Sequence, residues 1–275
     1  MKFYLFGFFL LGATSVISQP KLVTQAIVTT ITNVIAPEEE DAQNNAGAGG
    51  RMNFANMMDG ETKSTTWLKN DMVKTLLKSD VIKSTVYRNN ATKLTTTLLE
   101  IMGTKQAFYI SDSEQTELRK KADSVMQSRR NTDSVSAVPT PRSEPLTEIA
   151  DAGETKKIAG YNCKKAYLIT TRLLGLKDSV TVWYSPEIKL QNISSTGGLS
   201  AFGNMGSVSG LEKFEGFVMR YEMSMRRNRR MEVEVTKIET GKEVADKEFE
   251  IPKDIEIKPM REMQRMFGGA GMPRN

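Results

Sequence analysis

The residue types that most often carry catalysis are scarce in this chain of 275 residues, which has no histidine and a single cysteine, Cys163. Histidine is the commonest general base near neutral pH and the commonest metal ligand, so its absence excludes Ser/His and Cys/His catalysis and most zinc sites. Cys163 has no partner for an internal disulfide; it is either a small buried apolar residue or a thiol that pairs between molecules. The sequence therefore predicts no catalytic residue, no metal site, no cofactor and no enzymatic activity.

The remaining polar motifs have ordinary structural explanations. Glu232 and Glu234 share one side of an alternating segment, as on a solvated strand face. The glycines at 47 to 50 and at 197 and 198 lack the Lys and Ser/Thr of a phosphate-binding loop. Neither pattern indicates a reaction.

Methionine and aromatic residues give the more specific signal for a ligand. They alternate along one side of the segment 216 to 225, and a second aromatic face is expected near residue 165. The candidate ligand-binding residues are Tyr161, Tyr167, Met219, Tyr221, Met223 and Met225. Flexible, polarisable thioethers suit a wall that accepts apolar ligands of varied shape, but the same pattern is also typical of a methionine-rich core or, less specifically, of a copper(I) site.

The most basic cluster of the chain follows directly, in a predicted turn. Its arginines are Arg226, Arg227, Arg229 and Arg230. Such a turn either contacts anionic lipid headgroups at a membrane surface or is a charged hairpin tip that keeps the sheet edge soluble. A formal net charge of only +5 gives no reason to expect nucleic acid as a partner.

Strands must position these residues, because most segments show a two-residue hydrophobic period. The segment 156 to 188 predicts a long antiparallel hairpin that ends at Pro186, and 63 to 111 predicts a meander with Asn-rich turns. Residues 94 to 102 fit a helix or a strand; three consecutive threonines favour the strand. Phe249, Ile251, Ile255 and Ile257 predict a final strand. We expect a mainly β protein with a single large curved antiparallel sheet or half-barrel, and one or two helices as a lid.

The domain organisation expected from composition is simple. Residues 1 to 18 resemble a cleaved signal peptide, with Lys2 before an apolar run too short to span a bilayer. Residues 19 to 275 then form one β domain, with flexible loops at 36 to 61 and 194 to 210 and a helix plus Pro/Ser-rich insertion at 112 to 150. No cysteine lies near the cleavage point, so we expect a periplasmic protein that is not itself a lipoprotein.

Several segments together resemble a bacterial family of secreted proteins of unknown function that is grouped with the outer-membrane lipoprotein-carrier (LolA-like) fold. They are TTWLKNDMVKTLL at 65 to 77, KKIAGYNCKKAYLI at 156 to 169, VTVWYSPEIKL at 180 to 190 and KEFEIPKDIEIKPM at 247 to 260. The resemblance implies an antiparallel half-barrel with a lid over an apolar groove, in the periplasm or at the outer membrane. It implies no catalytic residues.

Two functions are consistent with these observations. The first is a non-enzymatic periplasmic protein that binds a hydrophobic ligand, a lipid or an acylated protein, in the concave face of its sheet. The second is a structural or protein-interaction module of the cell envelope, with an envelope protein as partner and no small-molecule ligand. Peripheral contact with a membrane is compatible with either function.

Overall fold

The computed structural model describes residues 19–35, 60–80, 82–101, 103–118, 120–121, 124, 146–171, 176–193, 208–225 and 228–262. Strands dominate this part of the chain. The longer ones are β2 (Gln25–Ile35), β3 (Gly60–Lys69), β4 (Met72–Lys78), β5 (Ile82–Asn89), β6 (Leu94–Ile101), β7 (Thr104–Ser111), β8 (Leu146–Ile158), β9 (Tyr161–Thr171), β10 (Lys177–Ser185), β12 (Phe217–Ser224) and β13 (Arg230–Glu239). Three short strands are β1 (Lys21–Val23), β11 (Ile188–Leu190) and β14 (Ile257–Pro259).

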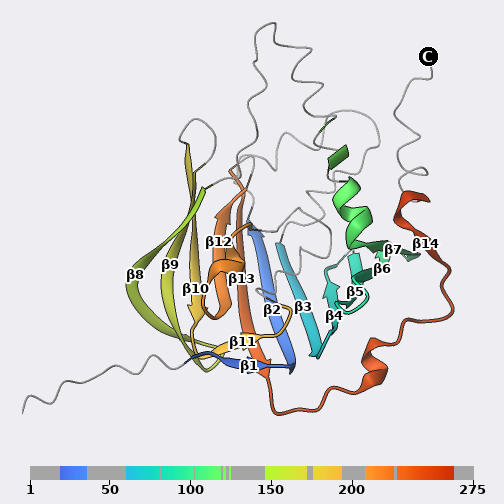
Figure 1. Ribbon diagram of the computed structural model, residues 1–275, viewed down its shortest axis with the longest axis horizontal. Helices are drawn as coiled ribbons and strands as arrows, with labels where there is room; N and C mark the ends of the chain where they lie inside the picture. The colour runs from blue at the N-terminus through green and yellow to red at the C-terminus, as the bar shows by residue number, and fades with distance from the viewer. Residues whose placement is uncertain are drawn as a thin grey trace, which may run out of the picture.

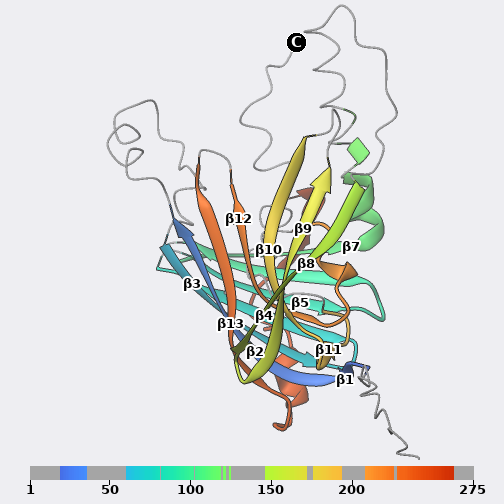
Figure 2. The ribbon, with the colours of Figure 1, turned by 90° about the vertical axis from the view of Figure 1, so that its left-hand side faces the viewer.

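Twelve of these strands form one open sheet in the order β14-β7-β6-β5-β4-β3-β2-β13-β12-β10-β9-β8. Every pairing is antiparallel except the parallel one between β14 and β7, and β1 and β11 form a separate parallel pair. Strands β10, β12 and β13 run upright in Figure 2, whereas β3 and β5 cross behind them, as expected from a strongly twisted sheet. The prediction of a mainly β protein with a large curved antiparallel sheet is confirmed (Figure 1).

The hairpins follow the turn chemistry of the sequence. Asn70 adopts a φ of 51° between β3 and β4, and Asn tolerates this left-handed conformation well. Ala159 and Gly160, with φ of 48° and 87°, form the two-residue turn between β8 and β9. The predicted hairpin within 156 to 188 is confirmed as β9 and β10, and residues 94 to 101 are a strand, as their threonines favoured.

Two clusters of buried side chains form the core on the half of the sheet that contains β2, β3, β8 to β10, β12 and β13. The first core cluster contains Val34, Ala166, Leu168, Val182, Leu211, Phe214, Val218, Tyr221, Met231 and Val233. The second core cluster contains Val23, Ala26, Val28, Leu68, Ile158, Cys163, Ile188, Leu190, Phe217, Met219 and Val235. Strands β1 and β11 contribute Val23, Ile188 and Leu190, so this short parallel pair covers the second core cluster.

Helix is a minor component of the described chain. Residues 112–118 are helical, and their first turn is held by a capping box in which the Glu114 backbone N–H donates to Ser111 Oγ and the Ser111 N–H donates to Glu114 Oε2. Asp112, the first residue of this helix, pairs with Arg88 of β5. The helical segments among the described residues do not include one long and apolar enough to cross a membrane.

Several boundaries differ from the expected ones or lie outside the described residues. The predicted final strand is mostly absent: residues Asp246–Phe249 form a 3₁₀ turn, and only Ile257–Pro259 pair, with β7. Pro252 lacks an N–H for a ladder, which explains the interruption. β8 begins at Leu146, inside the range assigned to the insertion. The predicted signal peptide and most of the predicted loops, at 36–59, 125–145 and 194–207, lie outside the described residues.

Candidate functional site

Strands β3 to β7 present three parallel rows of side chains on one face, because the register places outward residues of neighbouring strands opposite one another. The lysine row contains Lys63, Lys78, Lys83, Glu100 and Lys105. The middle row contains Thr65, Leu76, Thr85, Leu98 and Ala107. The aromatic row contains Trp67, Lys74, Tyr87, Thr96 and Tyr109. The face therefore changes from cationic through apolar to aromatic over three rows.

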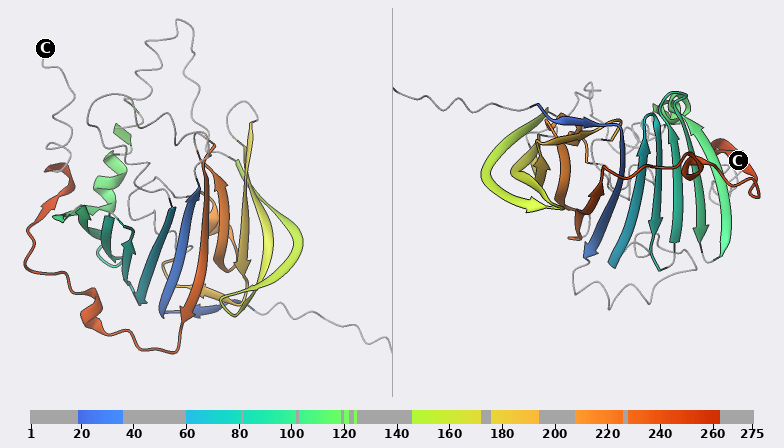
Figure 3. Two further views of the ribbon diagram at one scale, coloured as in Figure 1. Left: turned by 180° about the vertical axis from the view of Figure 1, so that it is seen from behind. Right: turned by 90° about the horizontal axis from the view of Figure 1, so that it is seen from below.

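The C-terminal strap, residues 240–259, crosses this face (Figure 3). Lys69 Nζ lies 2.6 Å from Asp246 Oδ1, and Lys74 Nζ lies 2.9 Å from Glu248 Oε2, so two ion pairs hold the 3₁₀ turn against β3 and β4. At its far end the strap adds β14 to the sheet, where Ile257 pairs with Ala107. Between these two attachments the strap leaves a gap over the sheet.

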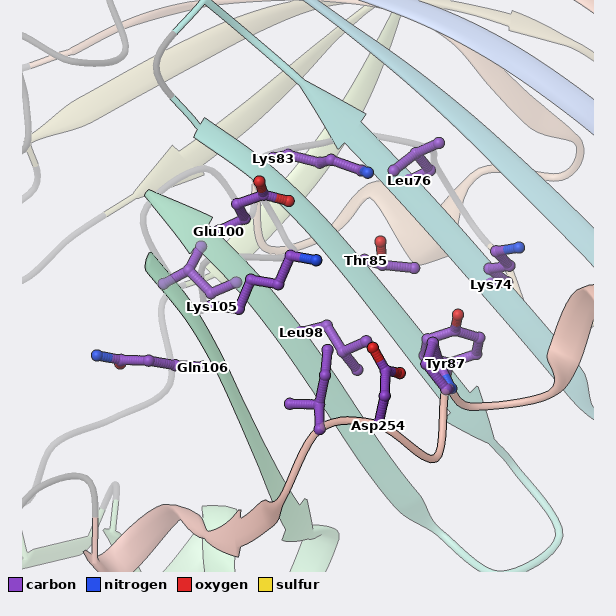
Figure 4. Close-up of a pocket in the computed structure, with 13 residues that line it drawn as sticks. Lys74, Leu76, Lys83, Thr85, Tyr87, Leu98, Glu100, Lys105, Gln106 and Asp254 are labelled. Carbon is purple, nitrogen blue, oxygen red and sulfur yellow. The ribbon is translucent and has the colours of Figure 1, made fainter. Parts of the chain in front are cut away.

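That gap is an open pocket of about 300 Å³. Its floor comes from the middle row, and Figure 4 shows Leu76, Thr85 and Leu98 between the lysine row and the strap. The full lining is Lys74, Leu76, Lys83, Thr85, Tyr87, Leu98, Leu99, Glu100, Lys105, Gln106, Pro252, Asp254 and Ile255. A second hollow, of about 380 Å³, adjoins it beside Asp254 and Ile255. The site is thus a groove with an apolar floor and a charged rim.

The electrostatics of the rim favour an anion. Lys83 and Lys105 are exposed, and within the described chain neither forms an ion pair, although Glu100 lies between them in the row. In Figure 4 the ammonium groups of Lys83 and Lys105 point to the same side, over the floor. Lys74, on the opposite rim, is already engaged by Glu248. Within the part of the chain that the structure describes, Lys83 and Lys105 are therefore available to a ligand.

Lys74 contacts its two aromatic neighbours in the aromatic row. Its ammonium lies 4.8 Å from the ring centroid of Trp67 and 5.8 Å from that of Tyr87, so it combines two cation–π contacts with the Glu248 ion pair. Burial, together with the Glu248 carboxylate, raises the pKa of the Tyr87 hydroxyl, which therefore stays neutral at physiological pH. On this side of the pocket the charge of Lys74 is therefore balanced by Glu248.

The chemistry available in the pocket is binding. Its carboxylates, Glu100 and Asp254, accompany three lysines and a neutral tyrosine. Among the residues that the structure describes, no group of three or more His, Cys, Asp or Glu is placed to hold a metal ion. The arrangement can bury an apolar chain on Leu76 and Leu98 and hold a negative group at Lys83 and Lys105.

The structure separates the residues that the sequence suggested as a ligand wall. Met219 and Tyr221 are 1% and 2% exposed and lie in the second and first core clusters, respectively. Met223 and Met225 are partly buried and pack against the first core cluster. Burial also raises the pKa of the Tyr221 hydroxyl. The alternating methionines and Tyr221 thus serve as core.

The two remaining tyrosines lie apart. Tyr161 packs against the second core cluster, whereas Tyr167 is 37% exposed on the opposite side of β9 from the fully buried Leu168. Lys165 Nζ lies 5.7 Å from the Tyr167 ring centroid, and its hydrogen bond to Glu154 raises the pKa of that ammonium. Tyr161 therefore contributes to the core, whereas Tyr167 is exposed.

The four arginines of the predicted basic turn also differ in their surroundings. Arg226 and Arg227 lie outside the described residues. Arg229 is 6% exposed, and Arg230 forms an ion pair with Glu222 of the neighbouring strand. The two arginines that the structure describes thus differ, because Arg229 is buried whereas Arg230 is exposed and ion-paired.

Sequence reasoning missed the pocket because its residues come from four strands and a distant strap. A local signal existed in Lys74, Leu76 and Lys78 on β4, which alternate lysine with an apolar side chain on one parity. On β5, Lys83, Thr85 and Tyr87 likewise share one parity. Only the register aligned these short patterns into rows, and only the structure placed Pro252 to Ile255 above them.

Fold and site together define a protein built on an open, twisted antiparallel sheet with an amphipathic groove under a C-terminal strap. Residues 49–255 match the model of a family described as a domain of unknown function (DUF4412), and the chain belongs to this family. This agrees with the predicted resemblance to a family of unknown function; its grouping with lipoprotein carriers stays a prediction.

Comparisons with curated proteins and with solved structures do not indicate a function. No curated protein matches the chain at a significant level. Two solved structures of PNGF-II, in space groups P21 and C2, are similar over 89% of this chain, with a TM-score of 0.37 and sequence identities of 14% and 16%. The chain spans about a third of the length of those chains, 33% and 32%.

Proposed function

We propose that this protein is a non-enzymatic binding protein of the bacterial cell envelope, located in the periplasm, that holds a hydrophobic ligand such as a lipid or an acyl chain. The observation that carries the proposal is the pocket under the C-terminal strap, in which the apolar floor of Leu76 and Leu98 lies beside Lys83 and Lys105, whose ammonium groups form no ion pair with any described residue. A fatty acid or the acyl part of a phospholipid combines the same two properties.

The size of the pocket sets the expected affinity. A volume of about 300 Å³ is at the lower end of ligand pockets and has room for roughly ten groups of about 30 Å³ each. Each fully buried methylene contributes about 0.8 kcal/mol, and an open groove recovers on the order of half of that. The chain then gains about 4 kcal/mol before ordering costs, which alone corresponds to a dissociation constant of about 1 mM. Contacts with the lysines offset part of the ordering costs, so we expect weak binding.

Binding of dodecanoate to the full chain tests the proposal. Titration followed by calorimetry or by amide chemical shifts should show saturable binding in wild type. Thr85→Trp, which fills the floor, and Leu98→Glu, which places a carboxylate on it, should each weaken binding more than tenfold. Leu94→Glu on the same strand, outside the pocket and 37% exposed, should bind like wild type. A protein that is folded by circular dichroism but does not bind dodecanoate at 1 mM contradicts the proposal.

The predicted methionine face gives an independent control. Met223 is partly buried beside the first core cluster and does not line the pocket. Met223→Glu in a folded protein should leave dodecanoate affinity within threefold of wild type. Loss of binding in this variant, with Leu98→Glu unaffected, would place the ligand on the methionine face instead. Native mass spectrometry of protein isolated gently from a periplasm identifies any ligand carried from the cell.

The second candidate function, an interaction module of the envelope, has one observation in its favour. β8 is an edge strand of the sheet, and its first half exposes Leu146 and Ile149 at 62% and 42%. Exposed apolar edge strands are sites where another strand can add to a sheet. An interaction module predicts a protein that binds no dodecanoate but captures an envelope protein, and that loses this capture when Ile149→Lys charges the edge.

A further inference from the structure

The lysine row is a cationic surface for which the protein supplies little counter-charge. Lys63, Lys78, Lys83 and Lys105 are all exposed, and within the described chain none of them forms an ion pair. Glu100 is the only acidic member of the row. Neighbouring strands are about 4.8 Å apart, so the row from β3 to β7 is roughly 19 Å long.

This arrangement works against the stability of the sheet. Lys63 lies directly opposite Lys78, and Lys78 directly opposite Lys83, so three ammonium groups repel one another across two ladders. The other charged strand face of the molecule is built differently. On β12 and β13, Arg220 lies within 3.2 Å of three carboxylates, those of Glu222, Glu232 and Glu234. Within the described chain, the charges on β12 and β13 are therefore paired, whereas the lysines of the lysine row form no ion pairs.

We propose that the lysine row binds the anionic headgroups of a lipid layer. The surroundings of the row favour lipid over nucleic acid, since the adjoining middle row offers Leu76 and Leu98 rather than aromatic rings on which bases could stack. A bilayer with acidic lipids presents an extended negative surface, and each lysine near it strengthens binding about fivefold. This activity is separate from ligand binding in the pocket and does not require it.

The geometry also places the pocket toward that surface. Lys83 and Lys105 belong to both the lysine row and the rim of the pocket, whereas Lys63 and Lys78 lie outside the pocket lining. A protein resting on its lysine row thus brings the apolar floor next to the headgroup layer. The row and the pocket can be tested apart because Lys63 and Lys78 belong to one and not the other.

Cosedimentation with vesicles tests the proposal. Wild type should bind vesicles of phosphatidylcholine with 30% phosphatidylglycerol, and binding should weaken steeply between 50 and 500 mM NaCl. The variant with Lys63, Lys78, Lys83 and Lys105 each changed to Gln should lose more than about 50-fold in affinity. The matched control carries the same charge change at four other exposed lysines, Lys157, Lys164, Lys177 and Lys189, and should stay within about threefold of wild type.

Each other outcome overturns the proposal. If the control loses as much as the lysine-row variant, net charge and not the row is responsible. If wild type ignores acidic vesicles but binds heparin or single-stranded DNA, the partner is another polyanion. If wild type binds pure phosphatidylcholine vesicles equally well, headgroup charge is irrelevant.

Failure of the proposed function has a different signature. Lys63→Gln with Lys78→Gln should weaken vesicle binding about 25-fold and leave dodecanoate affinity unchanged. Thr85→Trp, which adds no charge, should weaken dodecanoate binding more than tenfold and change vesicle binding less than threefold. Vesicle binding without any dodecanoate binding in wild type would refute the pocket alone, and the reverse result would refute the lysine row alone.

Discussion

Lys74 of β4 donates a 2.9 Å hydrogen bond to Glu248 of the C-terminal strap, across 174 residues of sequence. The lysine side chain is 16% exposed and the glutamate 33%, and the rings of Trp67 and Tyr87 flank the ammonium. This single pair joins the aromatic row to the segment that roofs the pocket. The position of the strap therefore depends on the contacts of Lys74.

Breaking the pair should loosen the strap. Lys74→Gln removes a half-buried ion pair and two cation–π contacts, for an expected loss of about 1 to 2 kcal/mol in the free energy of unfolding. Urea denaturation measures the loss, and amide hydrogen exchange should accelerate most at 246–249. The control, Lys237→Gln, removes a pair with Glu239 in which the lysine is 63% exposed, and it should cost less than about 0.5 kcal/mol. Equal costs would show that the strap is held by other contacts.

Acid should weaken the attachment of the helix that begins at residue 112. Arg88 forms a two-pronged ion pair with Asp112, with Arg88 Nη2 2.7 Å from Asp112 Oδ2, and this hydrogen bonding lowers the pKa of the carboxyl below its ordinary 3.8. A carboxyl with a lowered pKa in the folded state contributes stability that is present above the unfolded pKa and lost as pH falls through the folded one.

The pH dependence of unfolding checks this assignment. Between pH 4.5 and pH 2.5, wild type should lose stability more steeply than Asp112→Asn. Arg88→Met, which removes the partner of Asp112, should likewise show a shallower loss than wild type. Urea denaturation at half-unit steps of pH gives both slopes. If the three proteins show parallel slopes, the pair is not formed in solution.

The large curved sheet was predictable because its causes are local. Alternating apolar side chains define strands, and Asn or Gly at positive φ defines the turns, as at Asn70 and Gly160. Sequential hairpins then give an antiparallel sheet with few alternatives. The position of the strap was not predictable, because Glu248 and Asp246 show no preference for Lys74 and Lys69 until the sheet has formed.

The burial of the predicted methionine and tyrosine wall was not predictable for a related reason. Alternation shows that Met219, Tyr221 and Met223 share a face, but it does not show whether the protein fills the space beside them. Leu211 and Phe214, which follow a glycine-rich segment, fill part of it as members of the first core cluster. The lysine row was missed because each of its members belongs to a different strand, so no local pattern contains two of them in succession.

Ser84 is a buried polar residue whose removal should stabilise the protein. It is fully buried between Leu77 and Leu99 in the register, and its Oγ has no hydrogen-bond partner within the described chain. Ser84→Ala should raise the free energy of unfolding by about 0.5 to 1 kcal/mol, since an unsatisfied buried hydroxyl is costly.

A satisfied hydroxyl nearby gives the contrast. Thr75 Oγ1 lies 3.1 Å from Thr66 Oγ1, and Thr75→Val would leave the Thr66 hydroxyl without this partner. We expect a loss of about 1 kcal/mol for this variant. Thermal and urea unfolding of both variants measure whether the free energy of unfolding rises for Ser84→Ala and falls for Thr75→Val. A destabilised Ser84→Ala would mean that its hydroxyl is hydrogen-bonded in solution, for example to water.

Because the lysines of the lysine row repel one another, we expect a substitution in the row to change stability and vesicle binding in opposite directions. Lys78 faces Lys63 on one side and Lys83 on the other, so Lys78→Glu replaces two repulsive cross-strand pairs with two attractive ones. Opposed charges of this kind contribute roughly 0.2 to 1 kcal/mol each, and the variant should be about 1 kcal/mol more stable than wild type. Lys164→Glu, at a position that faces Thr155 and Tyr184, should show no such gain.

The same variant should bind acidic vesicles more weakly, because a carboxylate in the centre of the row repels the headgroups. Urea denaturation and vesicle cosedimentation on one preparation give both values. A gain in stability with a loss of vesicle binding is the expected result, since a surface kept for an anionic partner is not optimised for the isolated fold. If Lys78→Glu is less stable than wild type and binds vesicles equally well, the lysines of the row do not act together.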